Sequence, residues 1–321
     1  MKLSVFSPAL ADKTLEEACA FLQETGVQAM EVGCGGYPGK AHCDPEKLLA
    51  DEKALAEFRD TFRRHGLEIA ALSVHGNPVH PDQAEADRYH RDFVNAVLLA
   101  EKLGIDRIIA FSGCPGGSPE DRMPNWVTCA WPPEYPQVLD YQWNGVLIPY
   151  WKKTAAFAAE HGIRRLAFEM HPGFCVYNPE TLLRLRAAVG DIIGANLDPS
   201  HLFWQGIDPV EAIRLLDKAI YFFHAKDTRI DAANTARNGV LDTKHYSDAK
   251  NRSWIFRTVG WGHSQLEWNA IMSQLRIAGY DDIISIEHED GLMSNGEGLR
   301  KAIRFMQGVL MTEPTGEMFW A

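Results

Sequence analysis

The chain has 321 residues, 46% of them hydrophobic, and its 43 acidic and 32 basic side chains give a formal net charge of −11. A chain of this length can bury a large core, and its acidic balance argues against nucleic acid or anionic membrane as a partner, since both attract basic surfaces. No apolar run approaches the ~20 residues that a membrane span needs.

The N-terminus and the cysteines bear on the cellular compartment. The sequence MKLSVFSPAL has neither the apolar core nor the cleavage-like site of a secretory signal. Six cysteines are scattered along the chain without a CxxC pair, which is typical of free thiols in a reducing environment. We therefore expect a cytoplasmic protein.

Short apolar runs rich in β-branched residues predict eight strands. They are Leu3–Ser7, Ala29–Val32, Ile69–Val74, Arg107–Phe111, Leu166–Glu169, Ile192–Leu197, Ile220–His224 and Ile283–Glu287. Longer amphipathic runs between the strands predict helices near 14–25, 46–65, 84–103, 145–161, 179–189, 208–217, 265–278 and 297–310. Asn178 and Asp208 each precede a proline as helix-start signals, and glycines such as Gly104 stop a helix shortly before the next strand.

Eight strands, each followed by a helix, predict a single (β/α)8 TIM barrel. A doubly wound open sheet would need a glycine-rich phosphate turn after the first strand, and VFSPAL contains none. No linker divides the chain, so we expect one barrel domain over residues 1–311 and a C-terminal tail over 312–321. Two connections, Gly113–Tyr141 after strand four and Thr228–Gly262 after strand seven, are long enough to form lids or subunit contacts.

Four successive strands end in side chains that bind divalent cations. Glu169 ends strand five, Asp198 follows strand six, His224 ends strand seven and Glu287 ends strand eight. The C-terminal ends of barrel strands meet at one face, where converging carboxylates repel one another unless a cation lies between them. The sequence therefore predicts a metal site made by these four residues.

The donor types indicate which metal would bind. Three carboxylates and one imidazole, without a thiolate, suit Mn²⁺ first and Mg²⁺ or Co²⁺ next, and they suit a closed structural zinc site less well. Four protein ligands leave about two octahedral positions open. Two neighbouring oxygens of a substrate could fill those positions.

In order and spacing, the motifs FEMHP, LDPSH, HAKDTR and SIEHED resemble the sugar phosphate isomerase/epimerase branch of the xylose-isomerase-like TIM-barrel superfamily. The resemblance covers essentially the whole chain. That branch includes ketose 3-epimerases, inosose dehydratases and epimerases of oxidised glycosides. The resemblance implies that Glu169 and Glu287 bind metal and also exchange the substrate proton, and that His201 and Arg229 hold substrate oxygens.

The implied chemistry begins with removal of a proton next to a carbonyl group. A metal on the carbonyl and adjacent hydroxyl oxygens would stabilise the resulting enediolate. Return of the proton to the other face gives epimerisation, and its return to a neighbouring atom gives isomerisation. Loss of a β-hydroxyl would instead make the protein a dehydratase or lyase, of the inosose dehydratase or 3-keto-glycoside deglycosylating type. We expect an epimerase or isomerase, with the lyase as the second choice and a non-catalytic sugar-binding barrel as the third.

Further polar residues near the strand ends are candidates for substrate contacts. His201 could reach the substrate or orient a metal ligand. His171 and Lys226 are candidates as well, although Lys226 could instead pair with Asp227. His75, at the end of strand three, could bind a distal sugar hydroxyl.

Two other residues have open interpretations. Trp126, in the long loop after strand four, either stacks on a sugar or aglycone ring, or packs that loop or forms a subunit contact. Glu31, at the end of strand two, either lines the barrel mouth or neutralises a neighbouring cation.

We expect the substrate of this site to be a carbohydrate without a phosphate group. Phosphate in such barrels usually binds near the loops after strands seven and eight, but this chain has MSNGEG there, with Glu297 placed to repel it. The apolar tail residues Met318, Phe319 and Trp320 predict docking on the barrel or on a neighbouring subunit, which leaves a homo-oligomer open.

Overall fold

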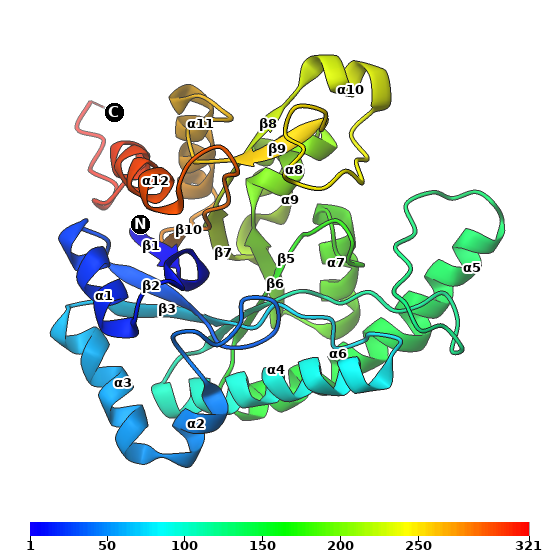
Figure 1. The fold of residues 1–321 in the computed structure, drawn as a ribbon, viewed down its shortest axis with the longest axis horizontal. Coiled ribbons are helices and arrows are strands. Elements are labelled where there is room, and N and C mark those ends of the chain that lie inside the picture. The colour runs from blue at the N-terminus through cyan, green and yellow to red at the C-terminus, as the bar shows by residue number, and fades with distance from the viewer. Residues whose placement is uncertain (321) are drawn as a thin grey trace.

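The computed structural model describes residues 1–320, in which eight parallel strands close into a barrel surrounded by helices (Figure 1). The strands are β1 (Lys2–Phe6), β2 (Ala29–Gly33), β3 (Glu68–Ser73), β4 (Arg107–Ala110), β5 (Arg165–Glu169), β6 (Ile193–Leu197), β7 (Ile220–Ala225) and β10 (Ile283–Ile286). They follow one another around the barrel in chain order, and β10 pairs with both β7 and β1 to close it. The predicted (β/α)8 fold is confirmed.

Several helices of the structure begin or end at the signals read from the sequence. The helices are α1 (Leu15–Glu24), α2 (Pro45–Ala50), α3 (Glu52–Arg64), α4 (Gln83–Leu103), α5 (Glu134–Asp140), α6 (Ile148–Glu160), α7 (Pro179–Val189), α8 (Pro199–Gln205), α9 (Pro209–Leu216), α10 (Ala232–Asn238), α11 (Gln265–Ile277) and α12 (Asn295–Val309). The Asn178 and Asp208 side chains cap α7 and α9, and Gly104 ends α4 with a left-handed φ of 73°. Within residues 1–320, no helix combines the length and apolarity needed to cross a membrane.

Two predicted helices differ from the observed ones. The segment 46–65 is two helices, because Asp51 has an extended backbone and its side chain caps the start of α3. The helix predicted near 145–161 begins at Glu134 and widens into a π-helical turn over Tyr141–Leu147 before α6. Pro149 lies two residues after this turn, at the start of α6, where its ring nitrogen cannot donate a helical hydrogen bond.

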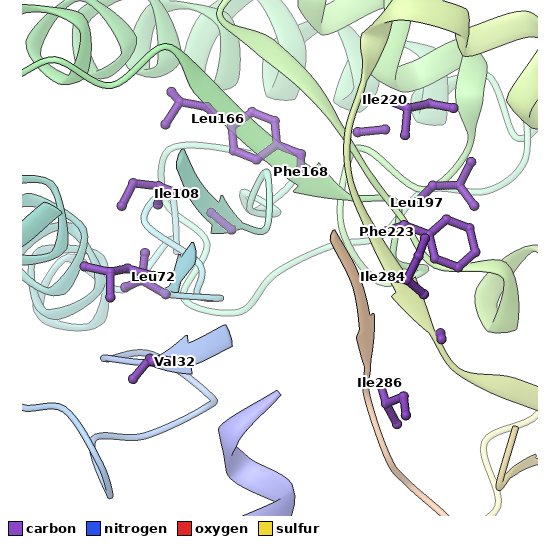
Figure 2. Close-up of a cluster of buried hydrophobic side chains, with 14 of the residues drawn as sticks. Val32, Leu72, Ile108, Leu166, Phe168, Leu197, Ile220, Phe223, Ile284 and Ile286 are labelled. Atoms are coloured by element: carbon purple, nitrogen blue, oxygen red, sulfur yellow. The ribbon is translucent and has the colours of Figure 1, made fainter. Parts of the chain in front are cut away.

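The two faces of each strand have different surroundings. Outward-facing side chains form the main hydrophobic cluster beneath the helices, and Figure 2 shows members from β2 to β7 and β10. A smaller inward cluster of Ala29, Ala71, Ile109, Ala167 and Phe222 fills part of the barrel interior. Since strand side chains alternate between faces, the next inward-facing residue of a strand, two positions later, also points toward the barrel axis.

The two long connections adopt different structures. The segment after β4 carries α5 and projects away from the barrel (Figure 1). The segment after β7 forms an antiparallel hairpin of β8 (Asp227–Ile230) and β9 (Trp254–Arg257), with α10 between them. Only this second connection contributes side chains to the large cavity described below.

The tail after α12 is only partly attached to the barrel. Arg276 donates hydrogen bonds to the carbonyl oxygens of Met311 and Glu313. Farther on, the side chains of Met318, Phe319 and Trp320 are exposed, so the expected docking on the barrel is not seen in the described residues. Docking on a neighbouring subunit stays a prediction, as does the boundary at residue 311.

Asp227 fastens both ends of the hairpin segment to the barrel. Its buried carboxylate accepts hydrogen bonds from the backbone N–H of Thr228 at the start, and of Gly260, Gly262 and His263 at the return. The His263 ring adds a contact of 2.8 Å to Oδ1. One side chain therefore fixes where this segment leaves the barrel and where it comes back.

We expect Asp227→Asn to lower the free energy of unfolding by about 3 kcal/mol, because several donors lose a charged acceptor in a buried place. Urea unfolding followed by circular dichroism measures this loss. The matched control is Asp208→Asn at the exposed cap of α9, which should change stability by less than about 0.5 kcal/mol, since asparagine also caps helices. Equal effects of the two substitutions would contradict the anchoring role.

Candidate functional site

The structure brings together the four side chains that the sequence suggests as metal ligands. One donor atom from each of Glu169, Asp198, His224 and Glu287 lies within 4.8 Å of the others. The side chains of Glu169, Asp198 and His224 are buried, whereas that of Glu287 is 17% exposed. Four strand ends, β5, β6, β7 and β10, therefore place one donor each at the same point. The metal-binding role of these residues stays a prediction.

His224 directs one ring nitrogen at this cluster and the other away from it. Its Nδ1 lies 3.1 Å from Glu287 Oε2 and 3.3 Å from Glu169 Oε2. Its Nε2 lies 2.9 and 3.0 Å from the two carboxylate oxygens of Glu31. Burial lowers the pKa of His224, but the three carboxylates outweigh burial and hold this pKa well above its usual value.

Asp198 holds a carboxylate oxygen that has no hydrogen-bond partner. Its Oδ1 accepts a hydrogen bond of 2.8 Å from Ser200 N, at the start of α8. Its Oδ2 is buried and unsatisfied, with His201 Nε2 3.4 Å away. Burial raises the pKa of Asp198 to about 6. Because a buried unpartnered oxygen is costly, this atom together with the oxygen-rich donor set fits a divalent cation.

Glu169 is surrounded by imidazole donors. His201 Nε2 donates to Oε1 at 3.1 Å, and His75 Nε2 donates to Oε2 at 3.1 Å. Burial raises the pKa of Glu169, but hydrogen bonds from His201, His224 and His75 lower it well below its usual value. His75 thus contacts a candidate ligand directly, whereas the sequence suggested it for a distal sugar hydroxyl.

His171 lies next to the same carboxylate as a neutral imidazole. Its Nδ1 donates to the carbonyl oxygen of Pro172, and its ring centroid lies 4.1 Å from that of His201. Burial lowers the pKa of His171 to about 3. A donor atom of His171 comes within 4.8 Å of one from Glu169 and one from His201. His171 therefore stays neutral inside the site at physiological pH.

Lys226 is buried between two acidic residues at the side of the cluster. Its Nζ lies 3.3 Å from Glu287 Oε2 and 2.7 Å from Glu289 Oε2, and 4.3 Å from the ring centroid of Phe256. It does not pair with Asp227, which the hairpin anchors occupy instead. The ammonium charge is thus largely neutralised by the protein itself.

A cavity of about 690 Å³ opens above the cluster. Its floor includes Glu169, His171, Lys226 and Glu287, and most of its wall is aromatic or aliphatic. The wall residues include Phe6, Pro8, Tyr37, Pro38, Phe111, Phe174, Tyr246, Ile255, Phe256 and Leu292. Phe111 and Phe174 stack on each other with ring centroids 4.2 Å apart.

Three substrate-binding candidates do not line this cavity, namely His201, Arg229 and Trp126. His201 is buried beside Glu169. The side chain of Arg229 is exposed on β8, whose backbone pairs with Ile255 of β9. Trp126 packs edge-on against Tyr177, with ring centroids 5.6 Å apart, which agrees with its alternative role in packing the loop. Glu31 does not line the cavity either, and instead faces the imidazole of His224.

Sequence reasoning missed most of the cavity wall. Phe6 and Phe111 end or follow strands β1 and β4, so the same attention to strand ends would have found them. Tyr37 and Tyr246 lie in connections that have no distinguishing pattern. Glu289, the second partner of Lys226, also went unnoticed, although it stands two residues after Glu287.

Comparison with known proteins identifies the family. Residues 19–309 match the model of the family described as xylose isomerase-like TIM barrel, and the chain belongs to that family. The uncharacterized protein YfiH of Bacillus subtilis is 38% identical over 310 residues, which are 96% of this chain and 98% of YfiH. The suspected superfamily is therefore confirmed.

Solved structures with low sequence identity share the fold. The IOLI protein with a bound zinc atom aligns with a TM-score of 0.66 and 19% identity over 97% of this chain and 98% of its own. The probable 3-DHS dehydratase AsbF of Bacillus anthracis aligns with a TM-score of 0.65 and 18% identity, over 96% of this chain and 99% of AsbF. The 3-keto-D-glucoside 4-epimerase YcjR of E. coli aligns with a TM-score of 0.63 and 12% identity, over 96% of this chain and 99% of YcjR.

We expect Asp198→Asn to stabilise the metal-free protein at pH 8. The folded pKa of about 6 exceeds the usual 3.8, so ionising this buried carboxyl costs free energy, about 2–3 kcal/mol. This cost of ionisation is absent below pH 4, grows between pH 4 and pH 6, and is fully present above pH 6. Thermal unfolding in the presence of a chelator, measured from pH 4 to 8, should show that the stability gained by Asp198→Asn relative to the unmodified protein rises with pH. A gain independent of pH, or equal to that of Asp208→Asn, would contradict this account.

Proposed function

We propose that this protein is a divalent-metal-dependent sugar epimerase or isomerase that acts on a non-phosphorylated keto-sugar or oxidised glycoside. The observation that carries the proposal is the convergence of Glu169, Asp198, His224 and Glu287 on one point, with Asp198 Oδ2 buried and unpartnered. Glu169 and Glu287 also line the cavity. The E. coli protein of the same fold that acts on a 3-keto-D-glucoside supports this choice of substrate class.

Glu169, Asp198, His224 and Glu287 would hold the cation, and we propose Mn²⁺ on the basis of their oxygen-rich donor set. A bound divalent cation polarises a substrate carbonyl and stabilises negative charge on its oxygen. His201 and His75 orient Glu169 through their hydrogen bonds. Lys226 orients Glu287 from the other side.

Glu169 and Glu287 are the groups that would move the proton. Burial alone would raise the pKa of Glu287, but Lys226 and His224 lower it to about 2, and the pKa of Glu169 is also low. Both carboxylates are therefore ionised and ready to accept a proton at neutral pH. Removal by one and return by the other would invert the substrate carbon, and proton transfer by a positioned carboxylate contributes ~10²–10⁴-fold.

The charges of the cavity support a substrate without phosphate. Four acidic residues line it, Glu169, Glu287, Glu289 and Asp290, against the single ammonium of Lys226. Two of these acids already contact Lys226, so no basic side chain in the lining is free to bind a phosphate. The volume and aromatic wall support a substrate larger than a free monosaccharide, such as a glycoside with an apolar aglycone.

A dehydratase or lyase is the second candidate, and the neutral His171 favours it. This imidazole lines the cavity beside Glu169, and its Nδ1–H bonds to the Pro172 carbonyl oxygen, so its Nε2 could accept a hydrogen bond from a substrate β-hydroxyl and position that group for loss. The probable dehydratase AsbF shares the fold. Both candidates begin with the same proton abstraction, so the products decide between them.

Metal-stripped protein reloaded with Mn²⁺ should incorporate deuterium from D₂O into one carbon of a suitable ketose, inosose or 3-keto-glycoside, with formation of its epimer. Proton NMR follows both events. Glu169→Gln and Glu287→Gln should each slow exchange by about 10²-fold or more, because each removes a proton acceptor. The control Glu68→Gln removes an exposed carboxylate that pairs with Lys2 and should leave the rate unchanged. Absence of both metal binding and exchange would refute the proposal, and loss of water would select the lyase.

For any substrate found, its phosphorylated counterpart should have a kcat/KM at least about tenfold lower, because the net negative lining repels a dianion. Steady-state kinetics on the matched pair measures this ratio. The discrimination should shrink at high salt, which screens charges. A preference for the phosphorylated sugar would contradict the charge argument.

A further inference from the structure

We infer that Glu31 is a positioning residue that fixes the His224 imidazole with Nδ1 toward the cation, and so strengthens divalent-cation binding. The inference rests on the proposed function in one respect, namely that His224 holds a divalent cation. Glu31 itself lies outside the cavity lining and would touch neither substrate nor cation.

Glu31 lies inside the barrel, beneath the candidate ligands. It is in the middle of β2, where its backbone pairs with Phe6 of β1 and Ala71 of β3. The side chain has no exposed surface. It reaches across the barrel interior to meet His224, which is on the non-adjacent strand β7.

The Glu31 carboxylate accepts all of the hydrogen bonds that surround it. Ser73 Oγ donates to Oε1, and Ser285 Oγ donates to Oε2 at 2.7 Å. The His224 Nε2 atom lies 2.9 and 3.0 Å from these same oxygens. A carboxylate held by two hydroxyl donors accepts a third hydrogen bond from Nε2–H, so Nε2 carries the proton.

A proton fixed on Nε2 of His224 determines the state of the other ring nitrogen, Nδ1. Metal ligation requires a neutral imidazole, and with the proton kept on Nε2 the lone pair lies on Nδ1, which points at Glu169 and Glu287. A carboxylate behind a metal-ligating histidine fixes the ring orientation and makes the ligand nitrogen more basic. Glu31 is placed to do both for His224.

A purely structural role does not account for a carboxylate in this position. Nearby inward positions of the same barrel are filled by apolar side chains, including Ala71, Ile109, Ala167 and Phe222. A buried carboxylate costs free energy unless it is paired, and its partner here is His224 itself. Aliphatic packing would serve stability at least as well, whereas only an acceptor orients the imidazole.

The test is the affinity of metal-stripped protein for Mn²⁺, measured by competition with a chromogenic chelator. Glu31→Gln should weaken binding about 10- to 100-fold, because the amide is a poorer acceptor and can donate. The Co²⁺-loaded variant should also show a shifted visible absorption band, which a change in stability alone would not cause. Glu68→Gln, the same change at an exposed site on the neighbouring strand β3, should bind Mn²⁺ as the unmodified protein does.

Two further variants keep the inference testable if Glu31→Gln fails to fold. Ser285→Ala and Ser73→Ala retain the carboxylate but each removes one of its donors, so each should weaken Mn²⁺ binding by about three- to tenfold. A folded Glu31→Gln variant with unchanged affinity and spectrum would overturn the inference and leave the proposed function intact. Unchanged affinity in both serine variants would overturn it when Glu31→Gln cannot be studied. Failure of the unmodified protein to bind any divalent cation would instead overturn the proposed function as well.

Discussion

The mutual repulsion of carboxylates collected at one barrel face is the constraint on which this structure depends. Glu169, Asp198 and Glu287 converge where water is largely excluded, and such a group is stable only when positive charge or donors balance it. The protein supplies part of this balance through imidazoles and Lys226. It leaves Asp198 Oδ2 without a donor, and that oxygen marks the place where the protein's own compensation is incomplete.

The barrel makes such a gathering possible because rigid strands hold the charged groups and loops form the cavity wall. Each candidate ligand lies at or just past a strand end, where backbone pairing to both neighbours limits its movement. The aromatic wall comes largely from connections, such as the one that carries Tyr37 and the hairpin segment that carries Tyr246. The candidate ligands and most of the aromatic wall thus come from different parts of the fold.

The sequence predicts the strands and the four converging donors well, because both depend on local patterns repeated in a regular architecture. Glu169, Asp198, His224 and Glu287 each follow an apolar run, so barrel closure alone brings them together. Contacts across the barrel are harder to predict. Side-chain directions and loop paths, which no local pattern encodes, determine the pairing of Lys226 with Glu289, the contact of Glu31 with His224 and the exposure of Arg229.

The attachment of the hairpin segment at Asp227 allows the cavity wall to change without a change in the position of His224. Departure and return of the chain are both secured at one carboxylate, so the intervening stretch behaves as an exchangeable module on a fixed base. Its residues in the cavity wall, Tyr246 and Ser247, can be changed while His224, three residues before the base, keeps its place. New specificities can thus arise without rebuilding the reactive centre.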